Sequence, residues 1–458
     1  MLDRFALQCC NWSQRWIPDA YVFAALAVLV VAIAALAIGV PLTHTADAFG
    51  GGFWSLIPFT MQMSFIVIGG YVVASAPVCA RAIDKLASWP SSSRGAVALV
   101  AATSMLASLL HWGLSMVFGA LLVRALNRRG ELQLNYFAAA AAAYLGMGSI
   151  WALGLSSSAA QLQANPASMP PQLLAITGVL PFEKTIFLWQ SLLLTAVLFV
   201  VTLAIAWFTA SPATDRSEIE VEPVAVSPIE GSKPADWLER QPLFNIALAL
   251  LGGIWLFREF AAKGFAGAIA NLNTYNFLFL TLGLLLCWRP RVFIDAVGRA
   301  VPAVAGVLIQ FPLYGGIAAI LTSATNAQGE SIAQHLAHFF TSAATEQSFP
   351  IVVGIYSAVL GFFVPSGGGK WVIEAPYVMQ AANELHVNLG WAVQTYNAAE
   401  ALPNLINPFW MLPLLGILRL RARDVIGYTM VQFIVHAPVV LFLLWALGLT
   451  LSYEPPHM

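Results

Sequence analysis

Long apolar runs, separated by short polar or basic stretches, set the pattern of this chain. A helix needs about 20 mainly apolar residues to cross a bilayer. Runs of that kind predict an all-α polytopic membrane protein with about nine membrane crossings. The predicted spans are residues 21–40, 53–74, 135–154, 185–210, 244–260, 271–288, 301–321, 390–415 and 425–449.

Two further apolar stretches, near residues 349–381 and 95–122, are interrupted in the middle. In the later stretch, a proline and three glycines at 365–369 separate two arms that are each too short to cross a bilayer. Backbone groups freed by such a break find no water in lipid, so the break must be buried in protein or line a wet cavity. Both stretches therefore predict re-entrant hairpins with polar tips, the earlier tip lying at 111–115.

Composition excludes several classes of protein. Hydrophobic residues make up 59% of the chain, charged residues only 9%, and the mean hydropathy is +0.77. A soluble protein usually has about 25% charged residues. The net charge of -1 and the lack of a basic patch argue against a nucleic-acid partner. The four cysteines have no CxxC spacing, so a thiolate metal site is not expected. No cofactor is expected besides the coupling ion.

Basic residues indicate the orientation, because lysine and arginine concentrate on the cytoplasmic side of a membrane. With the N-terminus inside, only Lys184, Arg258 and Lys263 fall outside, and Lys370 lies within the membrane. This distribution predicts a cytoplasmic N-terminus and a periplasmic C-terminus. Residues 211–241 are rich in Glu, Asp, Pro and Ser and lack apolar periodicity, so they are expected to form an acidic cytoplasmic linker.

The two halves of the chain share a pattern. A polar residue followed by Phe, three residues and Gly-Gly occurs at 64–70 and again at 310–316. Each copy precedes an amphipathic stretch, a hairpin and an interrupted span, in opposite topology. We expect two inverted repeats, an arrangement typical of secondary transporters, in which substrate binds at the repeat interface. The expected domains are the first inverted repeat (1–210, hairpin near 95–122), the linker (211–241), a connecting span (242–262) and the second inverted repeat (263–458, hairpin near 349–381).

The polar breaks in the two halves form the candidate site. Half-helix N-termini and exposed N–H groups suit a carboxylate, whereas unwound carbonyls and Asn or Ser side chains suit a small cation. Pro403 and Pro408 each remove a backbone donor, so the helix should unwind around Asn404. The predicted substrate-binding residues are Ser156, Ser157, Ser158, Ser366, Gly367, Gly368, Gly369, Lys370, Asn404 and Asn407; the predicted ion-coupling residues are His111, Ser115 and Glu400, with a Na+ site at Asn404 and Ser157 as an option.

Several of these residues have an alternative role. Lys370 is predicted to bind the substrate carboxylate, because intramembrane charges are costly and usually functional. It could instead pair with Glu374 or Glu400 and never meet substrate. The serines at 156–158 could serve helix packing, and His111 could be a neutral, hydrogen-bonded core histidine. These alternatives stay open at the level of sequence.

Five segments carry a resemblance to a known family: 16–19, 52–54, 310–312, 364–373 and 407–410. With them the chain resembles the short-chain fatty acid transporter family of bacterial inner (cytoplasmic) membranes over nearly its full length. The resemblance implies uptake of butyrate- and acetoacetate-type monocarboxylates. Through the wider ion transporter superfamily it also implies a homodimer and an elevator motion. At the first tip the family pattern resembles Asn-Trp-Gly where this chain has His111, and at the second tip His can replace Lys370.

The sequence thus predicts a secondary active transporter that couples H+ or Na+ to the uptake of short-chain fatty acids or similar small monocarboxylates. The expected partners are the substrate, the lipid bilayer and a second copy of the chain. Two alternatives are an intramembrane hydrolase or acyl transferase and a passive anion channel. The sequence contains no HExxH zinc pattern and no Gly-x-Ser-x-Gly elbow, so an enzyme is not expected.

Overall fold

The computed structural model describes residues 8, 20–55, 57–164, 166, 169, 171–211, 234–269, 271–332, 335, 342–363, 365 and 367–456. Over these residues the regular structure is helical, and the strand-like pairing is limited to one bridge between Thr325 and Ser331. The predicted all-α fold is therefore confirmed. The predicted binding residue Ser366 lies outside the described residues.

Every predicted span has a helix at its place in the chain. Because at least seven helices of the described chain are long and apolar enough to cross a bilayer, the protein is a multi-pass membrane protein. The helices are α2 (Ala20–Ala37), α3 (Leu42–Ser55) with α4 (Ile57–Ser75), α8 (Tyr136–Leu145), α11 (Trp189–Thr209), α13 (Leu243–Ile269), α14 (Leu272–Cys287), α15 (Pro290–Ser323), α19 (Leu389–Asn404) with α20 (Leu412–Leu418), and α21 (Ala422–Gly448).

The number of helices that can cross a membrane differs from the predicted nine. In the described part of the chain, seven helices are long and apolar enough, or eight if the bent pair α19 and α20 forms one span. The apolar part of α2 (Ala24–Ala37) and α14 fall short of the required length. Conversely α6 (Ser93–Leu110), expected as a hairpin arm, is long enough to be one of the seven.

Both predicted hairpins are helix pairs broken at the expected tips. In the first, α6 ends at Leu110 and α7 (Trp112–Asn127) begins after His111, whose backbone is extended. In the second, α17 (Phe349–Phe363) and α18 (Gly367–Glu384) flank the proline–glycine tip. The first pair packs along its length, whereas α17 packs mainly against α19 and α21.

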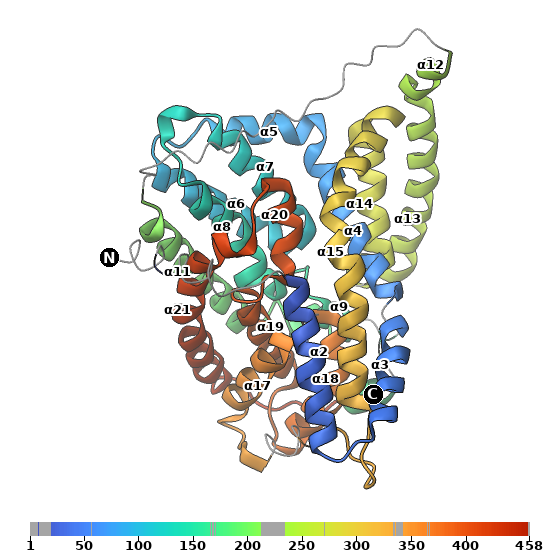
Figure 1. Cartoon of the computed structure of the whole chain (residues 1–458), viewed down its shortest axis with the longest axis vertical. Helices are drawn as coiled ribbons and strands as arrows, with labels where there is room; N and C mark the ends of the chain where they lie inside the picture. The colour runs from blue at the N-terminus through green and yellow to red at the C-terminus, as the bar shows by residue number, and fades with distance from the viewer. Residues whose placement is uncertain are drawn as a thin grey trace.

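The helices form two groups that lie side by side (Figure 1). One group contains α2, α3, α4, α13, α14 and α15, with α15 contacting α2, α3 and α4. The other contains both hairpins with α8, α11, α19 and α21. The groups meet where α4 packs on α7 and where α15 packs on α20. The candidate site belongs to the second group and to its boundary with the first.

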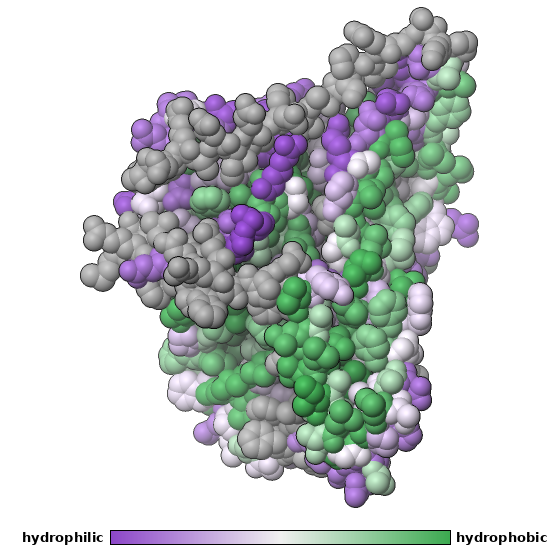
Figure 2. All heavy atoms as spheres, viewed as in Figure 1, coloured by the Kyte–Doolittle hydropathy of each residue, from purple (hydrophilic) through white to green (hydrophobic). Residues whose placement is uncertain are grey.

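The outer surface suits a lipid environment. Green hydrophobic residues cover most of the visible middle of the molecule, and purple hydrophilic residues gather toward its two ends (Figure 2). On α13, Leu251 and Phe257 expose 67% and 75% of their surface. Apolar side chains exposed along whole helices are expected where lipid, not water, is the solvent.

The described end of the predicted linker is helical, and the helix of the predicted connecting span is longer than expected. Within the linker, α12 (Pro234–Arg240) is helical, and residues 212–233 lie outside the described part of the chain. The connecting helix α13 continues to Ile269, past the predicted end at 262, with a non-helical residue at Gly264, where φ is +68°. Glycine tolerates that conformation without a Cβ clash. The domain boundaries themselves stay predictions.

Candidate functional site

The second hairpin places Lys370 among buried oxygen atoms. Lys370 lies in the first turn of α18, and its side chain has no solvent exposure. Its Nζ lies 2.5 Å from Oε2 of Glu400 on α19 and 3.2 Å from Oε1 of Glu374, one turn along α18. It also donates a hydrogen bond of 2.6 Å to the carbonyl oxygen of Ser357 on α17. An ammonium group has three donors, so these three oxygens are enough to occupy it.

We call Ser357, Lys370, Glu374 and Glu400 the charge cluster. Two carboxylates and one ammonium give it a formal charge of -1, and all three ionisable side chains are buried. Burying an unbalanced charge in protein is costly, so a cluster of this kind is a functional candidate. The ring of Tyr396 lies 4.6 Å from Nζ of Lys370 and adds a cation–π contact.

The two carboxylates differ in their contacts. Oε2 of Glu374 accepts a hydrogen bond of 2.5 Å from Oγ of Ser357 in addition to its ion pair with Lys370. Among the described residues, Glu400 makes a polar contact with Lys370, the ion pair through Oε2. Oε1 of Glu400 has no hydrogen-bond partner among these residues. Glu374 is thus held by two groups, Lys370 on its own helix and Ser357 on α17, and Glu400 by Lys370 alone among the described residues.

Two glycines, which have no Cβ, allow this close packing. A Cβ on Gly361 of α17 would lie 2.9 Å from Cγ of Pro403 and 3.0 Å from Oε2 of Glu400. At the tip, a Cβ on Gly367 would lie 2.5 Å from the ring of Trp151. Both glycines are therefore needed for close approach rather than for an unusual backbone conformation.

The interrupted span of the first half, which carries the predicted serines at 156–158, is broken from Gly146 onward. After α8, a π-turn (Gly146–Ile150) and a 3-10 turn (Trp151–Leu153) lead to a non-helical segment, and α9 starts at Ser158. The tip of the second hairpin touches this break through Gly367 and Trp151. Tyr396 on α19 holds the same tip by donating a hydrogen bond of 2.7 Å to the carbonyl oxygen of Gly367.

His111 caps a helix at the tip of the first hairpin. Its Nδ1 accepts a hydrogen bond of 3.0 Å from the backbone N–H of Leu114, in the first turn of α7. An accepting Nδ1 carries no proton, so the geometry assigns the proton of the neutral ring to Nε2. The ring is buried against Tyr275 and Phe279 of α14, at centroid distances of 4.9 and 3.8 Å.

The first tip also touches both interrupted spans. The backbone N–H of Ser156 donates a hydrogen bond of 3.3 Å to the carbonyl oxygen of Leu109, near the end of α6. The ring of Trp112 lies 5.0 Å from that of Trp410, edge to face, and Trp410 directly follows the break after α19. Tyr275 of α14 donates a hydrogen bond to the carbonyl oxygen of Leu110.

The two interrupted spans contact each other at their breaks. Nδ2 of Asn404 donates a hydrogen bond of 3.4 Å to the carbonyl oxygen of Met147, and the hydroxyl of Tyr144 donates one of 3.0 Å to the carbonyl oxygen of Asn404. Oγ of Ser157 donates a hydrogen bond of 2.9 Å to Oδ1 of Asn397. The four breaks, two in hairpins and two in spans, therefore converge in the interior.

Unwinding at Asn404 is confirmed. The helix α19 ends at Asn404, its last turn contains Pro403, and the chain bends by 73° before the segment Phe409–Leu418. Asn407 closes this bend by donating a hydrogen bond of 2.8 Å to the carbonyl oxygen of Phe362 and by accepting one from the N–H of Phe409. Its contacts join the bend to the end of α17.

The remaining predicted residues take different positions. Ser115 donates a hydrogen bond of 2.6 Å to the carbonyl oxygen of Ser104, inside the first hairpin. Ser158 is half-buried at the start of α9. Gly368 and Gly369 lie with Gly367 in the first turn of α18. The structure thus brings Ser157, Gly367, Lys370, Glu400 and Asn404 to the meeting breaks, and gives Ser115 a packing contact.

Sequence reasoning missed four residues at these breaks. Ser357 and Tyr396 complete the surroundings of Lys370, Trp151 supports the second tip, and Asn397 binds Ser157. Asn397 and Ser357 are polar residues inside apolar helices, which is a usable signal. Trp151 and Tyr396 carry no such signal, because aromatic residues are common throughout this chain.

Several buried polar atoms at the breaks lack a hydrogen-bond partner among the described residues. They include the donors Nε1 of Trp151, Trp371 and Trp410, the acceptor Oδ1 of Asn404, and Nε2 of His111. Buried polar groups are normally satisfied, so such a set near one place needs an explanation. A polar ligand that binds between the breaks would supply one. In the described residues, no group of three or more His, Cys, Asp or Glu side chains could hold a metal ion.

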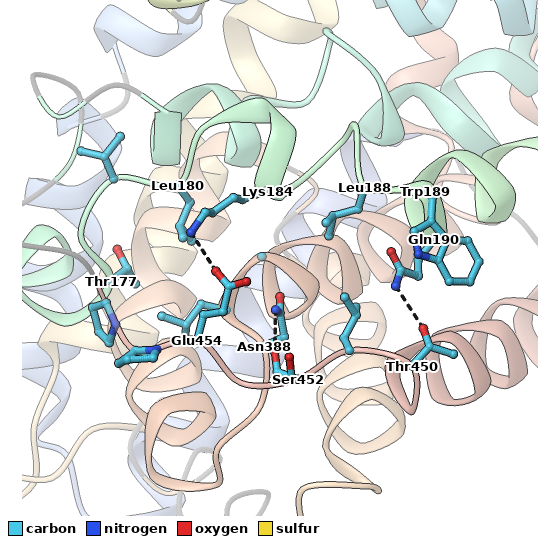
Figure 3. Close-up of a pocket in the computed structure, with 16 residues that line it drawn as sticks. Thr177, Leu180, Lys184, Leu188, Trp189, Gln190, Asn388, Thr450, Ser452 and Glu454 are labelled. Atoms are coloured by element: carbon cyan, nitrogen blue, oxygen red, sulfur yellow. Dashed lines mark hydrogen bonds and ion pairs between the residues drawn. The ribbon is translucent and has the colours of Figure 1, made fainter.

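A cavity of about 300 Å³ lies elsewhere, between the starts of α11 and α19 and the C-terminal segment (Figure 3). Lys184 and Glu454 point toward each other across it and form an ion pair of 2.8 Å. Gln190 likewise donates a hydrogen bond to Thr450. Because Glu454 already neutralises Lys184, this cavity offers an anionic substrate no unbalanced positive charge from that lysine. None of the predicted site residues lines it.

The family described as "Short chain fatty acid transporter" matches residues 1–447 of the chain. Two relatives, each named "Putative short-chain fatty acid transporter", come from Escherichia coli (strain K12) and Haemophilus influenzae (strain ATCC 51907 / DSM 11121 / KW20 / Rd). The first is 30% identical over 98% of this chain and 100% of its own length. The second is 29% identical over 96% of this chain and 98% of its own length.

Two solved structures are similar at lower identity. The Alcanivorax borkumensis YdaH transporter has a TM-score of 0.48 and 14% identity, covering 94% of this chain and 98% of its own. Neisseria gonorrhoeae MtrF, from a class of antimetabolite efflux pumps, has a TM-score of 0.47 and 15% identity, covering 97% of both chains.

Proposed function

The chain belongs to the short-chain fatty acid transporter family, and from this premise we propose that it takes up short-chain fatty acids or similar small monocarboxylates, such as butyrate or acetoacetate, by cation-coupled secondary transport. The family and the two relatives are named as transporters rather than enzymes, so the protein is not the intramembrane hydrolase or acyl transferase considered as an alternative.

The convergence of the four breaks is the observation that carries this proposal. It gathers tryptophan N–H donors, the Asn404 amide and the charge cluster inside an apolar helix bundle. Membrane proteins tolerate broken helices where they line a binding site, because ligand and neighbouring helices satisfy the freed groups. A carboxylate is an acceptor-only group and matches unpaired donors. The short alkyl chain would gain about 0.8 kcal/mol for each methylene buried.

Transport by an elevator motion is part of the proposal. The group of helices that contains both hairpins would move, carrying the site, against the group built around α15. The contacts between the groups support this division, since they are concentrated at α4 with α7 and at α15 with α20. We further propose a homodimer in the bacterial inner membrane, with the N-terminus in the cytoplasm and the C-terminus in the periplasm.

The coupling cation is H+ or Na+. The predicted coupling residues lie in two places, the charge cluster and the first hairpin. Glu400 belongs to the charge cluster, whereas His111 caps α7 and Ser115 binds a backbone carbonyl within the first hairpin. For Na+, Asn404 and Ser157 offer oxygen atoms at the breaks, although Oγ of Ser157 already donates to Asn397. Lys370 is proposed to meet the substrate carboxylate, which then has to replace one of its present oxygen partners.

Counterflow in proteoliposomes tests the proposal. Vesicles that contain the purified protein are loaded with unlabelled acetoacetate and diluted into labelled acetoacetate; transient accumulation of label is the expected result. Acetoacetate is the better probe, because protonated butyric acid crosses bilayers unaided, and protein-free vesicles provide the baseline. A passive anion channel would instead give continuous conductance and no dependence of accumulation on an imposed H+ or Na+ gradient. Absence of counterflow with acetoacetate, butyrate and similar monocarboxylates would contradict the proposal.

A further inference from the structure

The two carboxylates of the charge cluster are held by different numbers of contacts. Glu374 lies on the same helix as Lys370, one turn away, and is also bound by Ser357. Glu400 comes from α19, and its described polar contact is the ion pair with Lys370. If one carboxylate leaves Lys370, Glu374 stays hydrogen-bonded to Ser357, whereas Glu400 gives up one contact only. Glu400 is therefore the carboxylate that can be displaced.

We propose that a proton bound by Glu400 lets the substrate carboxylate take its place at Lys370, so that one proton and one monocarboxylate bind and move together. The inference rests on the proposed transport function and adds the identity of the coupling ion, its residue and its stoichiometry. In this step a proton from solution bonds to a carboxylate oxygen of Glu400, and no other covalent bond changes. The protonated Glu400 releases Lys370, and the substrate oxygen accepts the vacated hydrogen bond.

Charge balance explains why the two must bind together. The empty cluster has a formal charge of -1, from Lys370, Glu374 and Glu400. A carboxylate alone would raise this to -2 in a buried site, which is unfavourable. With one proton on Glu400, the loaded cluster returns to -1. The buried site therefore has the same total charge in the empty and the loaded state.

The geometry favours a proton over Na+ as the ion at this place. Nζ of Lys370 lies within 3.2 Å of an oxygen of each carboxylate. A metal ion bound to the same oxygens would stand beside the ammonium and be repelled by it. Sodium also needs several oxygen ligands at once, whereas a proton needs one carboxylate oxygen and no additional space.

No other charged group faces the cluster among the described residues of α17, α18 and α19 that pack around it. The hydroxyl of Tyr356 on α17 is paired with that of Tyr377 on α18 at 2.6 Å. Tyr396 presents its ring to Lys370 and uses its hydroxyl on Gly367. These phenols are occupied by hydrogen bonds, so Glu400 and Glu374 are left as the groups that exchange protons at the cluster.

Calorimetry on the purified full-length protein tests the inference. Butyrate is titrated at one pH in two buffers that differ in ionisation enthalpy, and the difference in heat gives the protons taken up per butyrate. We expect about one for the natural protein and none for Glu400→Gln, and Kd should rise by up to about tenfold per pH unit toward alkaline pH. The matched control is Glu454→Gln, at an exposed ion pair, which should take up protons as the natural protein does.

The outcomes separate the two proposals. Butyrate binding with no proton uptake and a Kd that is flat from pH 6 to 9 would overturn the inference while leaving the transport function in place. Proton uptake lost in Glu374→Gln but kept in Glu400→Gln would overturn the assignment to Glu400. If Glu400→Gln fails to fold, the pH dependence of Kd in the natural protein decides whether a proton is taken up, and Glu374→Gln decides the residue, because its proton uptake must then persist. Failure of the natural protein in both butyrate binding and acetoacetate counterflow would reject the proposed function itself.

Discussion

Both hairpins are helix pairs broken in the middle, but different groups stabilise the two tips. The first has arms that pack along each other, a neutral tip at His111, and contacts to α4 and α14. The second has arms that separate, because α17 packs on α19, and a tip whose neighbour Lys370 lies between two glutamates. A break in a membrane helix can therefore be stabilised either by capping and aromatic packing or by a buried ion cluster.

The contacts of the two tips suit different roles, because the first tip is fixed in place and the second can exchange an ion-pair partner. At the first tip, His111 caps α7 within the hairpin, and the hydrogen bond from Tyr275 to Leu110 joins the hairpin to a helix of the other group. At the second tip, Lys370 binds oxygen atoms on α17, α18 and α19, all within one group. One proton on a carboxylate redistributes the ion pairs of the charge cluster and leaves Lys370 a free donor, whereas a proton on Nδ1 of His111 would abolish the cap of α7. We therefore assign positioning to the first tip and coupling to the second.

The largest expected effect comes from Lys370→Met. It leaves two buried carboxylates without their shared cation, which should cost about 3–5 kcal/mol of stability. We expect a lower melting temperature in detergent and a smaller monodisperse peak in size exclusion. The double variant Lys370→Met with Glu400→Gln should recover part of the loss, because Glu374 keeps Ser357. If Lys370→Met alone melted at the same temperature as the natural protein, Lys370, Glu374 and Glu400 would not all be ionised in the folded protein.

The next largest loss of stability is expected for Gly70→Ala, which tests how tightly the first tip packs against α4. A Cβ at Gly70 on α4 would lie 2.7 Å from the backbone of Gly113 and Leu114. Backbone atoms cannot rotate away, so the hairpin must shift, at a cost of about 1–3 kcal/mol. Gly253→Ala is the matched control, because a Cβ there meets nothing within 4 Å. Equal melting temperatures for the two variants would mean that the first hairpin is free to move from α4.

The sequence predicted the helices well because each depends on local apolar runs. It also located the breaks, since Pro403 and the glycines at 367–369 act on the backbone near themselves. It could not decide whether Lys370 pairs with Glu374 or Glu400, and the structure shows both pairs. The contact with Glu374 is one helical turn away and readable from spacing, whereas the contact with Glu400 depends on how α18 crosses α19.

The early break after α8 was missed for a related reason. Residues 146–150 contain two glycines and a serine among apolar neighbours and read as an ordinary membrane helix. Their π-turn is fixed by partners far away in sequence. A Cβ on Gly148 would lie 2.6 Å from Leu405, and the carbonyl oxygen of Met147 accepts from Asn404. Contacts of this range are set by tertiary packing rather than by local propensity.

The smallest expected effect comes from His111, and it tests whether the two tips have different roles. His111→Ala removes the acceptor that caps α7, which should cost about 1 kcal/mol. His111→Asn keeps a side-chain acceptor at that position, and the melting temperature should return toward that of the natural protein. If the first tip only positions the site, His111→Asn must also take up the same number of protons per butyrate in the calorimetric test. Loss of proton uptake in this variant, with its melting temperature preserved, would move the coupling role from the second tip to the first.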